Sequence, residues 1–204
     1  MTDPIPSNGA PRRKIVLLGS AAVLAIGVIT VLFVLPAETG IDLTGFGARS
    51  DLTKIANPDA QKFLERGLKR KGVFTATDAA PAPEAGPSDH WTYEIQPYGE
   101  IELKYVLDKD APITFAWSAD GPLNYDMHAH PFEGGEALTE SYAIDKASEQ
   151  SGRYVAAFAG IHGWHWQNRG LTPVRITLDA SGKITGSKLL DGRSEEERAL
   201  TPAR

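Results

Sequence analysis

The chain has no cysteine among its 204 residues. This absence excludes a disulfide framework, thiolate metal ligands, a cysteine nucleophile and lipid attachment through cysteine. The formal net charge is −5 at pH 7, and residues 1–14 carry +2, so the rest of the chain carries −7. A surface of this charge has no electrostatic attraction to nucleic acid or to anionic lipid headgroups. The motifs of serine hydrolases, zinc proteases and phosphate-binding loops are also missing. We therefore predict a protein that is not an enzyme and binds no nucleic acid.

The most informative segment is Ile15–Leu35, which has 21 consecutive residues without a charge. A helix of this length reaches about 31 Å, close to the roughly 30 Å hydrocarbon core of a bilayer. Arg12, Arg13 and Lys14 precede it, and the first charges after it are acidic. This asymmetry predicts a single-pass protein of the bacterial inner membrane, anchored in lipid through residues 15–35, with residues 1–14 cytoplasmic and the C-terminal part periplasmic. The alternative is a cleaved signal peptide, whose apolar core is usually shorter and is followed by a small-x-small site that this chain lacks.

Composition divides the remainder of the chain. Residues 36–71 form a juxtamembrane connector with a short helix that starts at Asn57-Pro58, an N-cap residue followed by proline. Residues 72–90 are rich in proline and alanine and predict an extended linker. Residues 191–204 are a charged C-terminal tail that we expect to fray.

Residues 91–190 carry the pattern of a folded β domain. Short runs there alternate apolar and polar residues and are separated by glycine, proline, asparagine and aspartate. Eight or nine short strands with a turn every 8–12 residues or so predict an all-β fold, an antiparallel β-sandwich of the jelly-roll type. The membrane helix, the short helix and the linker would tether this domain in the periplasm.

Four of the five histidines lie in two short segments of this domain. His128 and His130 share one face of a strand with Asp126, because alternate residues of a strand point the same way. His162 and His165 flank Trp164 on a later strand. If the two strands pair, up to three imidazoles converge, as in copper and zinc sites. The candidate ligands are His128, His162, His130, His165 and Asp126.

The competing interpretation is structural, with no cofactor bound. Histidines beside large aromatic residues often only hydrogen-bond the main chain. On this interpretation His128 and His162 frame a polar-aromatic patch with Tyr125 and Trp164. Aromatic residues beside polar ones are typical of interface anchors, so this patch is the candidate partner surface.

Several segments together resemble a family of bacterial proteins described as transmembrane anchor proteins. These segments are Val34–Gly47, Ala116–Ser118, Leu123–His128, His162–Asn168 and Pro173–Leu178. The family has no established activity, and its pattern has histidine where His128 and His162 stand but other residues at 130 and 165. More distantly, an aromatic strand, a Gly-Arg-Tyr-like strand and an aromatic-x-Asn sequence are similar to the Golgi-dynamics (GOLD-like) β-sandwich, which recognises partners without catalysis.

The leading prediction is therefore a non-enzymatic binding or assembly module, anchored in the membrane and serving another membrane or periplasmic protein. The alternative is a periplasmic copper- or zinc-binding protein that uses the clustered histidines.

Overall fold

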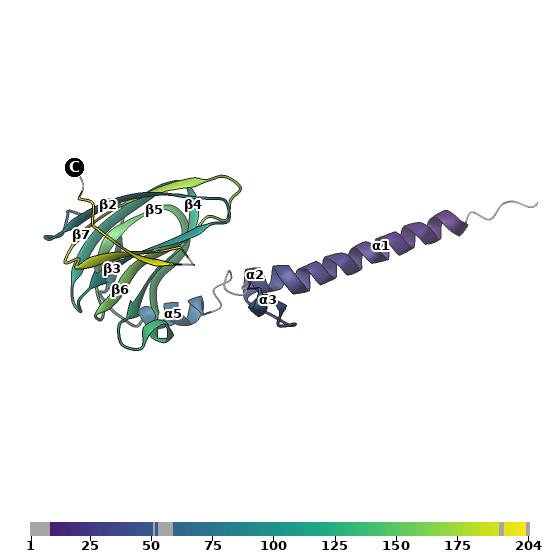
Figure 1. The fold of residues 1–204 in the computed structure, drawn as a ribbon, viewed down its shortest axis with the longest axis horizontal. Helices are drawn as coiled ribbons and strands as arrows, with labels where there is room; N and C mark the ends of the chain where they lie inside the picture. Colours follow the sequence, from purple (N-terminus) through teal and green to yellow (C-terminus); the bar gives the residue numbers. More distant parts are fainter. Residues whose placement is uncertain (1–8, 51, 53–58, 192–193, 203–204) are drawn as a thin grey trace, which may run out of the picture. The chain divides into compact units, whose positions relative to one another are not determined.

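The computed structural model describes residues 9–50, 52, 59–191 and 194–202. The chain forms two compact units, Met1–Asp59 and Ala60–Arg204, which we call the N-terminal unit and the β unit (Figure 1). The helix start predicted at Asn57-Pro58 lies outside the described residues.

The described part of the N-terminal unit is mainly helical and contains one stretch, Lys14–Thr39, that is long and apolar enough to cross a membrane. Pro36 lies near its end. A proline has no N–H to donate, and its ring collides with the carbonyl four residues earlier, so the helix widens into a π-turn just before it. Within residues 9–50 the elements of this unit are α1 (Gly9–Ile29), the π-helix η1 (Thr30–Val34), α2 (Leu35–Thr39) and α3 (Phe46–Arg49).

The β unit begins with one helix and is otherwise built mainly from antiparallel strands (Figure 1). The helix is α5 (Ala60–Gly67), and the short 3₁₀ helix η2 (Gly135–Leu138) joins β4 to β5. The strands are β1 (Phe74–Thr77), β2 (Ser88–Ile95), β3 (Glu100–Leu107), β4 (Pro112–Pro131), β5 (Glu140–Val155), β6 (Gly160–Gln167), β7 (Val174–Gly182), β8 (Gly186–Leu190) and β9 (Glu195–Arg198).

Strand β4 organises the sheet because its two halves have different neighbours. Its first half pairs with β7 and its second half with β6, whereas β5 pairs with both halves. The order continues as β6-β3-β8-β9 on one side, β7 also pairs with β2, and β1 joins the free edge of β5. The β unit is thus largely antiparallel sheet, as predicted. β4 itself is one continuous strand of 20 residues with a register shift against β5 between Ser118 and Leu123.

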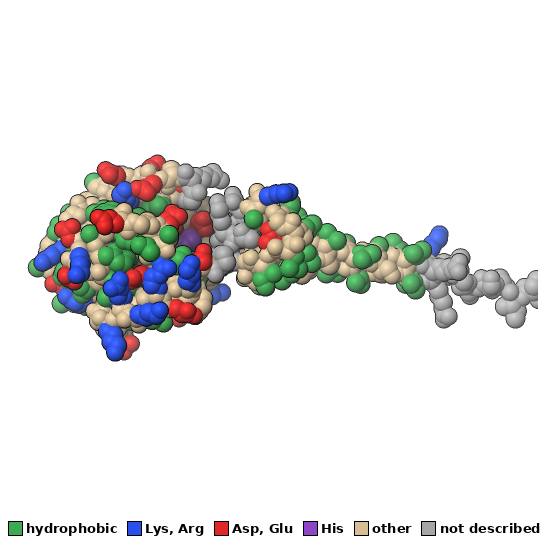
Figure 2. Space-filling view, turned by 90° about the horizontal axis from the view of Figure 1, so that it is seen from below, with side chains coloured by type: hydrophobic (Ala, Val, Ile, Leu, Met, Phe, Trp, Pro, Cys, Tyr) green, Lys and Arg blue, Asp and Glu red, His purple; other side chains and the backbone are tan. Residues whose placement is uncertain are grey.

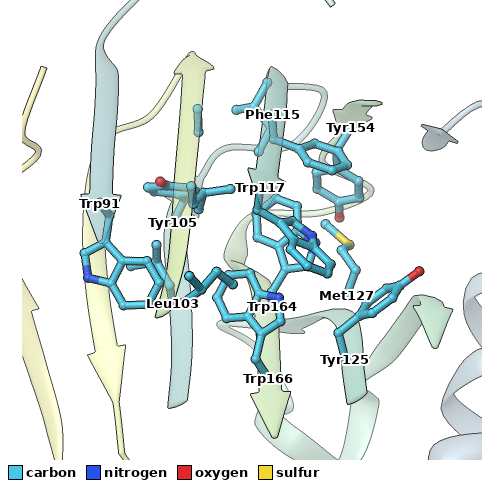
Figure 3. Close-up of a cluster of buried hydrophobic side chains, with 14 of the residues drawn as sticks. Trp91, Leu103, Tyr105, Phe115, Trp117, Tyr125, Met127, Tyr154, Trp164 and Trp166 are labelled. Atoms are coloured by element: carbon cyan, nitrogen blue, oxygen red, sulfur yellow. The ribbon is translucent and has the colours of Figure 1, made fainter. Parts of the chain in front are cut away.

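An aromatic core fills the space between the strands (Figure 3). Trp164 and Trp166 are fully buried and stack with an interplanar angle of 12°. Phe115 packs against Trp164 with ring centroids 4.6 Å apart. These side chains come from alternate positions of their strands, so the opposite faces of the same strands remain for polar residues. The candidate site lies on such a face.

The segment predicted as a Pro/Ala linker, residues 72–90, is part of the β unit. Phe74 starts β1, pairs in register with Tyr154 and stacks on Phe115 with ring centroids 5.8 Å apart. Glu84 forms an ion pair with Arg153. Phe74 supplies an apolar anchor that the average composition of the segment conceals.

The predicted frayed tail, 191–204, also contains a strand. β9 pairs with β8, and Arg198 donates two 2.7 Å hydrogen bonds to the buried carboxylate of Asp89. Thr201 N–H donates to the same carboxylate at 2.8 Å. A buried carboxylate needs such partners, and this need orders a charged segment that composition alone marks as frayed.

Candidate functional site

The candidate site lies on the second half of β4 and its neighbours β6 and β3. Residues that face the core, such as Met127 and Trp164, alternate with residues on the opposite face. In the middle of that opposite face, Gly163 of β6 stands between His128 of β4 and Lys104 of β3, because it is the register partner of both.

Gly163 leaves an opening above the central strand. A Cβ atom at this position would come within 2.0 Å of the Leu103 carbonyl oxygen, so the backbone geometry here requires glycine. Because no side chain covers the strand, the side chains of Lys104 and His128 meet above it. Lys104 Nζ lies 2.6 Å from His128 Nε2, and both residues are buried.

His130 brings a second imidazole to the same point. It lies two residues after His128 on the same strand face, and the two Nε2 atoms are 3.1 Å apart. The rings meet edge to face, with centroids 4.8 Å apart. The sequence prediction that these two histidines share a face is confirmed.

The other ring nitrogens determine which atom of each histidine carries the proton. Thr139 donates its only hydroxyl proton to the Glu136 carbonyl at 2.7 Å, so at 2.7 Å from His130 Nδ1 its oxygen accepts. His128 Nδ1 lies 3.2 Å from the Asp126 carbonyl oxygen, which only accepts. Both rings therefore carry hydrogen on Nδ1, and both Nε2 atoms are unprotonated acceptors.

Glu102 of β3 completes the cluster with a carboxylate. Its Oε2 lies 3.3 Å from Lys104 Nζ and 3.6 Å from His128 Nε2. Glu102, His128 and His130 are the one group in the described part of the chain whose three potential ligand atoms all lie within 4.8 Å of one another. We call these three side chains the Glu-His-His cluster.

Burial sets the protonation of the cluster. It lowers the pKa of His128 well below the usual range and the pKa of His130 to about 4, and the nearby Lys104 adds to both effects. Burial also lowers the pKa of Lys104, although Glu102 and Asp126 oppose that shift. For Glu102, burial alone would raise the pKa, but Lys104 and nearby histidines lower it overall. Two neutral imidazoles thus stand beside a carboxylate, a donor set suited to a metal ion.

Asp126, a predicted ligand, lies beside the Glu-His-His cluster and outside it. Its Oδ2 accepts a hydrogen bond from the Ser141 hydroxyl at 3.1 Å, whereas its buried Oδ1 accepts no hydrogen bond and lies 3.7 Å from His128 Nδ1. Burial raises the pKa of this carboxyl to about 6.

The other two predicted ligands lie elsewhere. His162 faces the aromatic core, and its Nδ1 is 2.7 Å from the Tyr154 hydroxyl. His165 shares the face of the cluster, but its Nε2 lies 3.2 Å from Glu100 Oε2. The predicted convergence of His162 with His128 is wrong, because the register places Ala129 opposite His162 and so puts the two rings on opposite faces.

The predicted partner surface is not a surface. His128, Tyr125, His162 and Trp164 have relative exposures of 6%, 8%, 0% and 0%. They also divide between the two faces of the sheet. On the one face of the β unit that Figure 2 presents, histidine is visible as a small patch among charged and hydrophobic side chains.

The sequence reasoning missed Glu102 and Lys104. The sequence of β3 alternates polar and apolar residues, and this alternation places Glu102 and Lys104 together on one face of the strand. The missing information was that β3 lies beside β6, which a single sequence does not contain.

Comparison with known proteins adds no assignment. No family model matches the chain, and no curated protein matches it. Among solved structures, the P-domain of Macrobrachium rosenbergii nodavirus aligns at 10% identity over 54% of this chain and 90% of its own. The TM-score of that alignment is 0.12, too low to indicate a shared fold.

Proposed function

We propose that the chain is a single-pass protein of the bacterial inner membrane whose β unit is a non-enzymatic module that binds a transition-metal ion in the periplasm. The apolar helix Lys14–Thr39 and the basic residues before it support the anchor and its orientation. The division of β4 between β6 on one side and β7 on the other supports a sandwich arrangement of the sheet. The ligand is proposed from the Glu-His-His cluster.

One observation carries the metal proposal: two unprotonated imidazole Nε2 atoms lie 3.1 Å apart, with both Nδ1 positions engaged. Two unprotonated nitrogens at this separation repel each other unless a positive species lies between them. Metal-ligating histidines typically donate the other ring N–H to a carbonyl, carboxylate or water, which fixes the ring. The Asp126 carbonyl and the Thr139 hydroxyl fill these positions here.

The separation matches a shared metal ion. Nitrogen ligands at about 2.0–2.1 Å from zinc are about 3.3 Å apart in a tetrahedral site and about 2.9 Å apart at a right angle. The observed 3.1 Å lies between these values. The Glu102 carboxylate, 3.6 Å from His128 Nε2, supplies the third ligand after a small side-chain movement.

The donor types select the metal class. Imidazole nitrogens favour zinc and copper, whereas magnesium and calcium prefer sites made only of oxygen. Two nitrogens and one carboxylate oxygen therefore suit a first-row transition-metal ion, and we propose Zn²⁺ or Cu²⁺. Three protein ligands leave one position for water or for a ligand from another molecule.

Lys104 occupies the cluster in this structure as an internal cation. Its ammonium donates to the His128 Nε2 lone pair and is fully buried. A metal ion would replace this donor, so Lys104 must move aside when metal binds. Its flexible four-carbon stem permits this movement, which makes the site an exchangeable one rather than a permanent structural centre.

The test is a titration of the full chain in detergent micelles with Zn²⁺ and Cu²⁺, followed by calorimetry and thermal unfolding. One ion should bind per chain. Saturation at a hundredfold excess over Kd should stabilise the fold by about 2.7 kcal/mol. Binding should be lost in His128→Ala and in His130→Ala.

His90→Ala is the matched control, since His90 is an exposed histidine of the same unit, paired with Asp179. It should bind metal like the unaltered chain. Equal binding by all four proteins, or no binding by the unaltered chain, would reject the proposed function.

A further inference from the structure

Helix α5 is the first element of the β unit, and it contacts the loop that orients His130. α5 is the first described helix of the unit, which begins at Ala60 after the N-terminal unit ends at Asp59. Its neighbour in space is the segment 137–142, which runs from the end of η2 into β5. The helix and this segment are about seventy residues apart in the sequence.

Arg66 makes the contact that matters for the site. Its Nη1 donates hydrogen bonds to the carbonyl oxygens of Thr139 at 2.7 Å and Ala137 at 3.1 Å. The Thr139 hydroxyl accepts from His130 Nδ1 and donates to the Glu136 carbonyl, each at 2.7 Å. A guanidinium on α5 therefore binds the main-chain carbonyl of the residue whose hydroxyl fixes the His130 ring.

The loop has reason to need this support. Gly134 and Gly135 precede Thr139 with φ values of 92° and 54°, in the left-handed region that glycine tolerates at least cost. Glycine pairs leave a loop with many accessible conformations, so its native shape depends on contacts made elsewhere. Arg66 supplies two such contacts, one on the carbonyl of Thr139 itself and one on the carbonyl of Ala137.

Close packing holds α5 in place for this role. A Cβ atom on Gly67 would lie 2.0 Å from the Ser141 carbonyl oxygen, so the helix approaches the start of β5 as closely as the backbone allows. Arg70 adds a bidentate pair with the buried carboxylate of Glu140, with distances of 2.8 Å and 3.0 Å. Arg70 thus docks the helix without touching Thr139.

From these contacts we infer that Arg66 is a positioning residue for the metal site, acting through Thr139 to fix the tautomer and orientation of His130. The inference rests on the proposed function for its metal readout. It also assigns α5, the element through which the chain enters the β unit, to the support of the site. Because coupling between two equilibria is reciprocal, metal at His130 then strengthens the docking of α5.

The experiment compares the full chain with Arg66→Ala, Thr139→Val, Thr139→Ser and Arg70→Ala in detergent micelles. The first readout needs no metal. Nitrogen NMR of ¹⁵N-histidine-labelled protein should show His130 as the Nδ1–H tautomer in the unaltered chain and in Thr139→Ser. Arg66→Ala and Thr139→Val should show a mixture of tautomers.

The second readout is the Zn²⁺ dissociation constant by competition with a chromophoric chelator. Residues that orient a ligand typically change metal affinity by 10–100-fold. We expect this loss in Arg66→Ala and Thr139→Val, whereas Thr139→Ser should restore affinity to within about threefold. Arg70→Ala should lower the melting temperature of the protein yet keep the His130 tautomer and the affinity.

The two readouts separate the two proposals. If the unaltered chain binds no zinc but Arg66→Ala still mixes the tautomers, the metal function fails and the positioning role stands. If the chain binds zinc and Arg66→Ala leaves both tautomer and affinity unchanged, the positioning role is overturned alone. Equal losses in Arg66→Ala and Arg70→Ala would also overturn it, since general loosening of α5 would then explain both.

Discussion

Replacing Lys104 with methionine should tighten metal binding, although it deletes a buried contact of the site. Lys104 Nζ lies 2.6 Å from His128 Nε2, so a metal ion about 2 Å from that nitrogen would stand within about 5 Å of the ammonium. With an effective dielectric constant of about 20, a divalent ion and an ammonium at about 5 Å repel each other by about 7 kcal/mol. Metal binding to the natural chain must therefore move Lys104 away.

When Lys104 moves away, most of that repulsion disappears, but a part of it remains. The movement also breaks the 3.3 Å contact between Lys104 Nζ and Glu102 Oε2. If one fifth of the repulsion remains, about 1.4 kcal/mol, Lys104→Met binds zinc about tenfold more tightly. Methionine matches the unbranched shape of lysine and keeps the core of the unit filled.

The assay is competition for Zn²⁺ with a chromophoric chelator, on full-length chains in the same detergent. Lys146→Met is the matched control, because it removes one lysine charge from an exposed position of β5. It should change the affinity less than about twofold. Unchanged or weaker binding in Lys104→Met would refute the reasoning, since Lys104 would then be a supporting group and not a competitor.

Three other outcomes follow from the structure. Burial lowers the pKa of His162 to about 3, and the unfolded chain takes up this proton below about pH 6.5. The free energy of unfolding should therefore fall as the pH drops from about 6.5 toward 3, by up to about 5 kcal/mol, and urea titrations of His162→Phe should show a smaller fall. Gly163→Ala places a Cβ atom against the Leu103 carbonyl, so it should destabilise the β unit by roughly 3 kcal/mol or more in the same titrations, and a loss below about 1 kcal/mol would contradict the geometry. A reporter enzyme that works only outside the cytoplasm should be active when it is fused after Arg204. Activity at the same position of a reporter that works only in the cytoplasm would contradict the orientation.

Local sequence signals predicted much of this molecule because they depend only on neighbours in the chain. The apolar length of residues 15–35 predicted the helix, and the alternation after Trp91 predicted antiparallel strands. The same alternation placed His128 and His130 on one strand face, where they meet at 3.1 Å.

Long-range pairing explains what the sequence could not predict. Glu102 reaches the histidines only because β3 lies two strands from β4, across Gly163. His162 looks equivalent to His128 in sequence, yet its register directs it into the aromatic core. Asp89 and Arg198 are 109 residues apart, so the order of the C-terminal strand depends on a partner that composition does not identify.

The most direct test of the metal site is an anomalous diffraction map, measured at the zinc absorption edge, from crystals of the zinc-loaded protein. We expect one peak between β3 and β4, about 2.0–2.1 Å from Nε2 of His128 and of His130 and about 2.0–2.2 Å from an oxygen of Glu102. Lys104 should have left its position beside His128. Zinc-loaded crystals that keep the contact between Lys104 and His128, with no anomalous peak at the Glu-His-His cluster, would contradict the central claim.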